Sequence, residues 1–317
     1  MDATEFPNFN LGIYRHRLIS KNRIGLYYSW GKFIHYLHKK FEDKGKPMEV
    51  ALAIGLHPCI TTAAYDPGHH LHEYELAGSL MEEPVDLVKC ETVDLYVPAQ
   101  TEIVIEGTVP IGVRQREGPF GEWHRTYGEI VDAPLIDISC ITHRNNPIYQ
   151  HASSGQHAEN SFPMAREADY VATLRKYFPT VLRAHMPAVY VTPYFCVIQM
   201  KKMNEGDPIS VGILALGMAQ LSYAIVVDED VDIYDLREVL WAVVTRARPD
   251  EDFVIIPRAK GNRLDPTTYD RLRDKKGSMV TKTVIDATVK TGVSRDQPKV
   301  IREPLIGTIN LAEYGII

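Results

Sequence analysis

Residues 116–123 read Arg-Glu-Gly-Pro-Phe-Gly-Glu-Trp, and this stretch places two carboxylates, Glu117 and Glu122, on either side of a turn. Proline fixes its own φ angle, and glycine takes backbone angles that other residues avoid, so the turn is expected to be rigid. Its aromatic residues, Phe120 and Trp123, favour a partly buried position. The stretch therefore predicts a stiff loop that aims both carboxylates at one place.

Paired carboxylates in a site that excludes water differ in pKa, so one can carry a proton near neutral pH while the other stays charged. Such a pair is suited to proton transfer. The alternative, from the eight residues alone, is two solvated glutamates that flank a hairpin turn.

The composition is that of a globular protein of one large or two medium domains, with 317 residues, 45% hydrophobic and 24% charged. A formal net charge of -6 and the lack of a long basic run argue against nucleic acid and anionic membranes as partners. No apolar stretch approaches the ~20 residues of a membrane span, and the first residues do not resemble a signal peptide. Four well-separated cysteines without a Cys-x-x-Cys pair favour reduced thiols in a cytoplasmic protein.

The first half of the chain is expected to be rich in strands with short helices, as in a barrel or sandwich. Residues 10–19 and 23–28 predict a hairpin. Residues 30–44 predict a helix with Phe33, Leu37 and Phe41 on its apolar face. Further strands are predicted over residues 50–56, 86–95, 101–106, 136–142 and 147–151.

The character of the sequence changes after Pro163, and the domain boundary is placed between residues 150 and 165, giving domains of residues 1–160 and 161–317. Helices are predicted over 164–178 and 209–221, and a mostly extended segment over 188–201. Residues 224–227, 235–247 and 253–256 read as strand, helix, strand. This pattern predicts a βαβ unit with a parallel pair of strands.

His69, His70 and His72 precede Glu73 and form the densest set of possible metal ligands in the chain. They lack a His-x-x-x-His pair on a helix and a cysteine partner, so they do not make a zinc signature. The alternative is the exposed polar start of a helix.

Several motifs together resemble one family, the UbiD-like decarboxylases, and they occur in the family's order over most of the chain. These motifs are Asn10-x-Gly12-Ile13-Tyr14-Arg15, Glu73, Glu117-Gly-Pro-Phe-Gly-Glu122 and Lys282-x-x-Ile285-Asp286-Ala287-Thr288.

The resemblance implies an α+β protein: a split β-barrel flavin-binding domain in residues 1–160, then an α/β domain containing a βαβ unit, in residues 161–317, that serves oligomerisation. It implies non-oxidative decarboxylation or carboxylation of an aromatic or α,β-unsaturated carboxylic acid through a covalent adduct with prenylated FMN. The family's catalytic set maps to Arg15, Glu117 and Glu122, with Glu122 as the proton donor.

The resemblance also implies a set of cofactor ligands. The flavin is expected at Asn10, Ile13, Tyr14 and Lys282. Its phosphate is expected to bind through a divalent metal, manganese, beside a potassium ion. The family's metal ligands are an asparagine, a histidine and a glutamate, of which Asn10 and Glu73 match the first and last.

Elementary chemistry agrees with this division of roles. Loss of CO2 leaves an electron pair that protein side chains accommodate poorly and a modified flavin accommodates well. A carboxylic acid, here Glu122, then protonates the carbon, a step that typically contributes ~10²–10⁴-fold. Arg15 would hold the substrate carboxylate or pair with Glu117 through charge-assisted bonds. The alternative for Arg15 is a structural salt bridge.

The sequence departs from the family first at Phe33, where many members have the metal-binding histidine. A phenyl ring cannot ligate a metal, and on a helix His35 points elsewhere. The site then recruits another group, such as the histidines before Glu73, binds metal weakly, or has lost it. A phosphate held by positive side chains without metal is a further possibility.

The second departure is that the chain begins almost at Asn10, where family members carry a substantial preceding region. The resemblance thus describes an N-terminally short member that lacks one wall of the flavin site unless a partner subunit supplies it. A milder departure is Arg125, which could recognise a second anionic group on the substrate or be solvated.

Two hypotheses follow. In one, the chain is an active (de)carboxylase for a small-molecule carboxylic acid. In the other, it is a cofactor-poor or non-catalytic subunit of a multi-subunit enzyme. Either one predicts a homo- or hetero-oligomer, with a homologous partner subunit as one form of it, and neither nucleic acid nor membrane as a partner.

Overall fold

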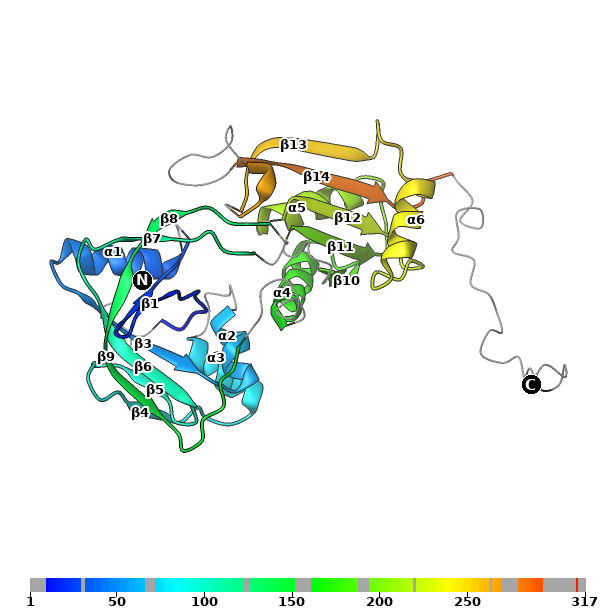
Figure 1. Ribbon diagram of the computed structural model, residues 1–317. Helices are drawn as coiled ribbons and strands as arrows, with labels where there is room; N and C mark the ends of the chain where they lie inside the picture. Colours follow the sequence, from blue (N-terminus) through cyan, green and yellow to red (C-terminus); the bar gives the residue numbers. More distant parts are fainter. Residues whose placement is uncertain are drawn as a thin grey trace.

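Two separate five-stranded sheets organise the chain, one in each half (Figure 1). The computed structural model describes residues 10–29, 32–65, 72–122, 126–151, 161–187, 194–218, 221–262, 264–268 and 279–292, together with Ala312. We refer to residues 10–151 as the N-terminal half and to residues 161–292 as the C-terminal half.

The sheet of the N-terminal half is antiparallel, in the order β1-β2-β9-β6-β3. Its strands are β1 (Leu18–Ser20), β2 (Arg23–Gly25), β9 (Leu135–His143), β6 (Ile103–Val109) and β3 (Met48–Ile54). Two short ribbons accompany it, β4 (Leu87–Lys89) with β5 (Tyr96–Pro98) and β7 (Gln115–Glu117) with β8 (Val131–Ala133). The helices of this half are α1 (Phe33–Asp43), α2 (Pro58–Tyr65) and α3 (Glu73–Met81).

Helix α1 forms as predicted, but the predicted apolar face is right only for Leu37 and Phe41 and wrong for Phe33. Ile34 and His38 are buried, Leu37 and Phe41 pack against the core at its edges, and Phe33 is 52% exposed. Residues four apart lie on the same face of a helix, so burial of Ile34 and His38 turns Phe33 toward solvent. The residue at the family's metal-ligand position therefore lies outside the hydrophobic core.

The main strands predicted for this half form, but some strands are shorter than predicted, one does not form and one was missed. The predicted hairpin forms, but its strands are only three residues long, and residues 10–17 are irregular except for a bridge between Arg15 and Tyr27. The strand predicted over residues 147–151 does not form, because Ile148 donates its backbone N–H to the side chain of Glu102 rather than to a neighbouring strand. Strand β5 was missed because it contains Pro98, which only an edge or short ribbon tolerates.

The sheet of the C-terminal half has helices on both faces. Its order is β10-β11-β12-β14-β13, from β10 (Val181–His185), β11 (Phe195–Met200), β12 (Tyr223–Val227), β14 (Met279–Ala287) and β13 (Phe253–Lys260). Helices α4 (Ser161–Tyr177) and α5 (Asp207–Met218) pack on one face, and α6 (Leu236–Arg246) packs on the other. A short 3-10 helix, η1, spans Pro266–Thr268.

The predicted helices of this half all form, but one strand pairing was wrong. Strands β12 and β13 flank α6 in sequence and were expected to be parallel neighbours, whereas β14 lies between them and pairs antiparallel with β13. Strand β14 is buried on both faces from Val284 to Ala287 and therefore needs a central position, while β13 exposes Ile255 and suits an edge. The parallel neighbours joined by one helix are instead β11 and β12, through α5.

The two halves meet at α2 and α4, which are in contact. There the guanidinium of Arg166 in α4 lies over the ring of Tyr65 in α2, 4.9 Å from its centroid. All four cysteines are free, as expected. Within the described part of the chain, no helix is both long and apolar enough to span a membrane.

The packing of α5 on β14 gives a test of the C-terminal half. A Cβ atom at Gly212 would clash with Cγ1 of Val284, so Gly212→Ala should lower the free energy of unfolding by about 1–3 kcal/mol. Gly217→Ala on the same helix is the control, since nothing lies within 4 Å of its added methyl and alanine favours a helix by about 1 kcal/mol over glycine. Denaturant unfolding of both variants checks this, and equal stabilities would contradict the packing.

Candidate active site

The loop after β7 is shaped so that only glycine fits at its start. Gly118 has a φ of +94°, and a Cβ atom there would lie 2.8 Å from the backbone oxygen of Glu129. The loop then closes on itself, because Glu122 donates its N–H to Thr126 and Gly128 donates to Phe120. The loop thus has the tight turn that its sequence predicts, while Trp123 and Arg125 lie outside the described residues.

Arg15 binds both carboxylates of this loop. Its Nε and Nη2 atoms donate to Oε1 and Oε2 of Glu117 at 3.0 and 2.9 Å, and its Nη1 donates to Oε1 of Glu122 at 2.6 Å. This is the fork geometry in which arginine binds a carboxylate most strongly. The guanidinium also lies between two rings, 4.3 Å from the centroid of Tyr27 and 4.6 Å from that of Phe120.

The three charged side chains differ in their access to water. Glu117 is 3% exposed, Glu122 11% and Arg15 25%. Burial lowers the pKa of Arg15, but the bonds and charges of the two glutamates outweigh this effect, so the pKa of Arg15 is raised overall. Arg15 therefore remains charged, and it neutralises only one of the two carboxylates beside it.

The predicted residues Asn10, Tyr14 and Glu73 lie near one another. Asn10 Nδ2 donates to the hydroxyl of Tyr14 at 3.4 Å, and the pKa of Tyr14 is raised by burial and by the charge of Glu73, partly offset by the Asn10 bond. Glu73 is the first residue of α3. Ile13, predicted to contact the cofactor, is 45% exposed.

The histidines before Glu73 do not all have the same role. His72 is the N-cap of α3 and accepts the backbone N–H of Tyr74 at its Nδ1, which matches the alternative of a polar helix start. His69 and His70 lie outside the described residues.

Among the described residues, those present do not fit the manganese site that the resemblance implied. Asn10 and Glu73 offer oxygen ligands, but Phe33 has no donor atom at the position of the third. Within the described ranges, no three histidine, cysteine, aspartate or glutamate side chains come together in a way that could hold a metal ion.

In the motif from Lys282 to Thr288, Asp286 shapes the backbone, whereas Lys282 is a buried cation. Asp286 accepts bonds from the backbone and hydroxyl of Thr288 and pairs with Lys290, so it shapes the end of β14. Lys282 is buried and donates to the backbone oxygen of Leu216 at 2.6 Å. Its pKa is lowered by burial and by the charge of Lys260.

Two residues that the sequence did not single out have notable surroundings. The Nε atom of Arg166 is buried and has no hydrogen-bond partner among the described residues. A buried donor left unsatisfied costs about 1–3 kcal/mol. Tyr27 packs its ring against the guanidinium of Arg15, which it faces across the predicted hairpin.

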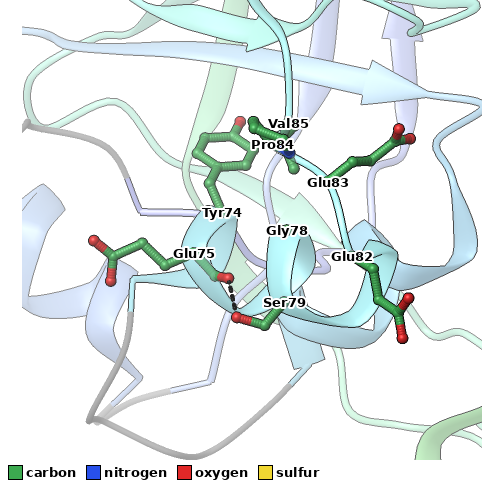
Figure 2. A pocket seen from close by; sticks show the side chains of 8 residues that line it. All are labelled: Tyr74, Glu75, Gly78, Ser79, Glu82, Glu83, Pro84 and Val85. Atoms are coloured by element: carbon green, nitrogen blue, oxygen red, sulfur yellow. Dashed lines mark hydrogen bonds between the residues drawn. The ribbon is translucent and has the colours of Figure 1, made fainter.

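An open cleft of about 550 Å³ lies elsewhere, on α3 and the turn that follows it (Figure 2). Its lining includes Tyr74, Glu75, Ser79, Glu82 and Glu83. The Ser79 hydroxyl donates to the backbone oxygen of Glu75. Arg15, Glu117 and Glu122 do not line this cleft, so the cleft is separate from the candidate active site.

Comparison with known proteins identifies the class. Two family domains of 3-octaprenyl-4-hydroxybenzoate carboxy-lyase match the chain, the Rift-related domain over residues 2–157 and the C-terminal domain over residues 162–287. The fold and these matches are those of a carboxy-lyase. The chain belongs to the UbiD family.

Individual relatives agree with this assignment. Phenolic acid decarboxylase of Bacillus subtilis is 33% identical over 328 residues, which cover 99% of this chain and 66% of that protein. The UbiD-class enzyme HmfF from Pelotomaculum thermopropionicum, solved in complex with FMN, is 35% identical with a TM-score of 0.87 over 96% of this chain and 67% of that one. An evolved dimeric form of HmfF, in complex with prenylated FMN (prFMN), has 33% identity and a TM-score of 0.81 over 96% and 65%. The chain thus spans about two thirds of the length of these relatives.

The buried pairing of Arg15 predicts a large stability effect. Arg15→Met leaves the carboxylate of Glu117 buried without its partner, which should cost about 3 kcal/mol, and Glu117→Gln in the same chain should recover part of it. Arg23→Met is the control, because its pair with Asp137 is exposed and should contribute at most about 1 kcal/mol. Denaturant unfolding of these three variants and the parent chain measures these differences. Equal losses for Arg15→Met and Arg23→Met would show that the buried pair does not hold the loop.

Proposed function

We propose that this chain catalyses the non-oxidative decarboxylation, or the reverse carboxylation, of an aromatic or α,β-unsaturated carboxylic acid with prenylated FMN. The observation that carries the proposal is the contact of Arg15 with both Glu117 and Glu122. Relatives solved with FMN and prFMN, and a relative that is a phenolic acid decarboxylase, support the cofactor and the substrate class.

Arg15 has the donors to orient a substrate carboxylate. A guanidinium has five N–H donors, and the two glutamates occupy three of them. The remaining donors can bind the carboxylate of the substrate while Glu117 holds the guanidinium in place. Glu117 is therefore the positioning residue of the trio, and its burial keeps this bond away from water.

Glu122 is the proton donor to carbon in this proposal. It is bound to Arg15 through one oxygen only, and it is more exposed than Glu117. With both carboxylates ionised the trio has a net charge of -1, a balance that suits the uptake and release of one proton at a carboxyl oxygen of Glu122. When bound, the flavin supplies the sink for the electron pair left by CO2. Asn10, Tyr14 and Lys282 are proposed to contact it.

We further propose that residues 1–160 are the split β-barrel flavin domain and that residues 161–317 serve oligomerisation. Support comes from the antiparallel sheet of the N-terminal half and from the matched domains, which end at residue 157 and begin at residue 162. One of the related solved structures is an evolved dimeric form.

A second candidate function is favoured by Phe33. A chain that lacks the metal-ligating histidine could act as a cofactor-poor subunit that completes a homologous partner. Absorption spectroscopy of the chain purified alone, after co-expression with a flavin prenyltransferase, separates the two: a stoichiometric flavin excludes the cofactor-poor subunit.

The catalytic proposal predicts that Glu122→Gln lowers turnover by at least about 100-fold, because the amide cannot donate the proton. The measurement is hydrogen–deuterium exchange and CO2 release with a panel of phenolic and unsaturated acids, using protein co-expressed with a flavin prenyltransferase. Glu83→Gln is the control, since Glu83 is an exposed glutamate in the separate cleft on α3 and should leave turnover unchanged. Full activity of Glu122→Gln would remove Glu122 from the mechanism.

A further inference from the structure

The loop after β7 has two arms, residues 118–122 and residues 126–130, that lie side by side. Gly121 in the first arm forms a β-bridge with Tyr127 in the second. Gly128 donates its backbone N–H back into the first arm at 2.8 Å. These contacts fix the backbone of Gly128 next to the arm that carries the proposed proton donor.

Gly128 lies against the carboxyl group of Glu122. A Cβ atom on Gly128 would be 2.8 Å from Oε1 of Glu122 and 3.5 Å from its Cδ and Cγ atoms, its three nearest contacts among the described residues. The φ angle of Gly128 is outside the left-handed region, so the backbone does not require glycine there. Gly118 differs, because both its φ angle and a nearby backbone oxygen exclude a side chain. The missing side chain at Gly128 therefore makes room for one particular group, the carboxyl of Glu122.

The oxygen of Glu122 that lies against Gly128 is also the one that Arg15 holds. The Nη1 atom of Arg15 donates to Oε1 at 2.6 Å. A charge-assisted bond of this length is strong and depends on the negative charge of the accepting oxygen. A proton on the carboxyl group therefore belongs on Oε2, where it leaves the bond between Oε1 and Arg15 intact.

We propose that Gly128 is a positioning residue for Glu122: because it has no side chain, Oε1 stays on Arg15 and Oε2 carries the proton to carbon. The inference rests on the proposed function for the role of Glu122, whereas the contact with Gly128 does not. In the step itself the O–H bond at Oε2 breaks, and a C–H bond forms from the electron pair that CO2 leaves behind. The negative charge that returns to the carboxylate forms beside the guanidinium of Arg15.

An added methyl group at position 128 should move the proton donor while the loop stays folded. The atom that it would meet is the end of a flexible side chain, so the carboxyl turns away and the backbone keeps its place. Gly128→Ala should therefore lower kcat by about 10–100-fold, because a small displacement of a reacting group costs that much, and leave KM unchanged. CO2 release by protein co-expressed with a flavin prenyltransferase measures both.

Gly121→Ala is the matched control. It adds the same methyl group to the residue next to Glu122, but no described atom lies within 4 Å of that methyl, so kcat should equal that of the parent chain. Glu122→Asp provides a rescue, since the shorter side chain withdraws the carboxyl from position 128. The loss of kcat caused by Gly128→Ala should be at least about 5-fold smaller in the Glu122→Asp chain than in the parent.

A second measurement needs neither cofactor nor turnover. Gly128→Ala should lower the denaturant midpoint of unfolding of the full chain, because it weakens the bond between Glu122 and Arg15. In a chain that already carries Glu122→Ala the same substitution should cause no such shift, since the methyl group then meets no carboxyl. If Gly128→Ala alone fails to fold, the chain with both alanine substitutions should fold, and that recovery supports the contact.

The inference is overturned if Gly128→Ala keeps the kcat of the parent, if Gly121→Ala loses as much kcat as Gly128→Ala, or if Glu122→Ala does not relieve the stability loss of Gly128→Ala. These outcomes are distinguishable from failure of the proposed function. An active parent that Glu122→Gln inactivates and Gly128→Ala does not would keep the proposed function and lose this inference. A parent that turns over no acid would lose the proposed function, and the unfolding comparison alone would then decide whether Gly128 keeps the carboxyl of Glu122 on Arg15.

Discussion

The interaction on which the site depends is the bond network between one guanidinium and two carboxylates that lie more than a hundred residues away. Arg15 belongs to an irregular segment beside a very short hairpin, and Glu117 and Glu122 flank a glycine-rich turn. The buried bidentate pair joins them, and the rings of Tyr27 and Phe120 enclose it on both sides. Removal of water strengthens the pair and makes its loss costly.

The same arrangement explains why one arginine can serve both structure and chemistry. Glu117 takes two of its donors and fixes its plane, whereas Glu122 takes one and remains closer to solvent. An acid held by a single bond can change its protonation state without releasing the guanidinium. The alternative of a purely structural salt bridge thus accounts for Glu117 better than for Glu122.

The sequence by itself determined the family, the rigid turn, helices α1, α4, α5 and α6 and the main strands, because each depends on local pattern: helical spacing in α1, β-rich runs in β6 and β9, and glycine where φ is positive at Gly118. It also placed Arg15, Glu117 and Glu122 in one site, through the motifs of the family. Only the tertiary structure decided the rest. The position of β14 between β12 and β13 and the rotation of Phe33 out of the core each depend on which distant surfaces are buried together, and that is not encoded in any one stretch of residues.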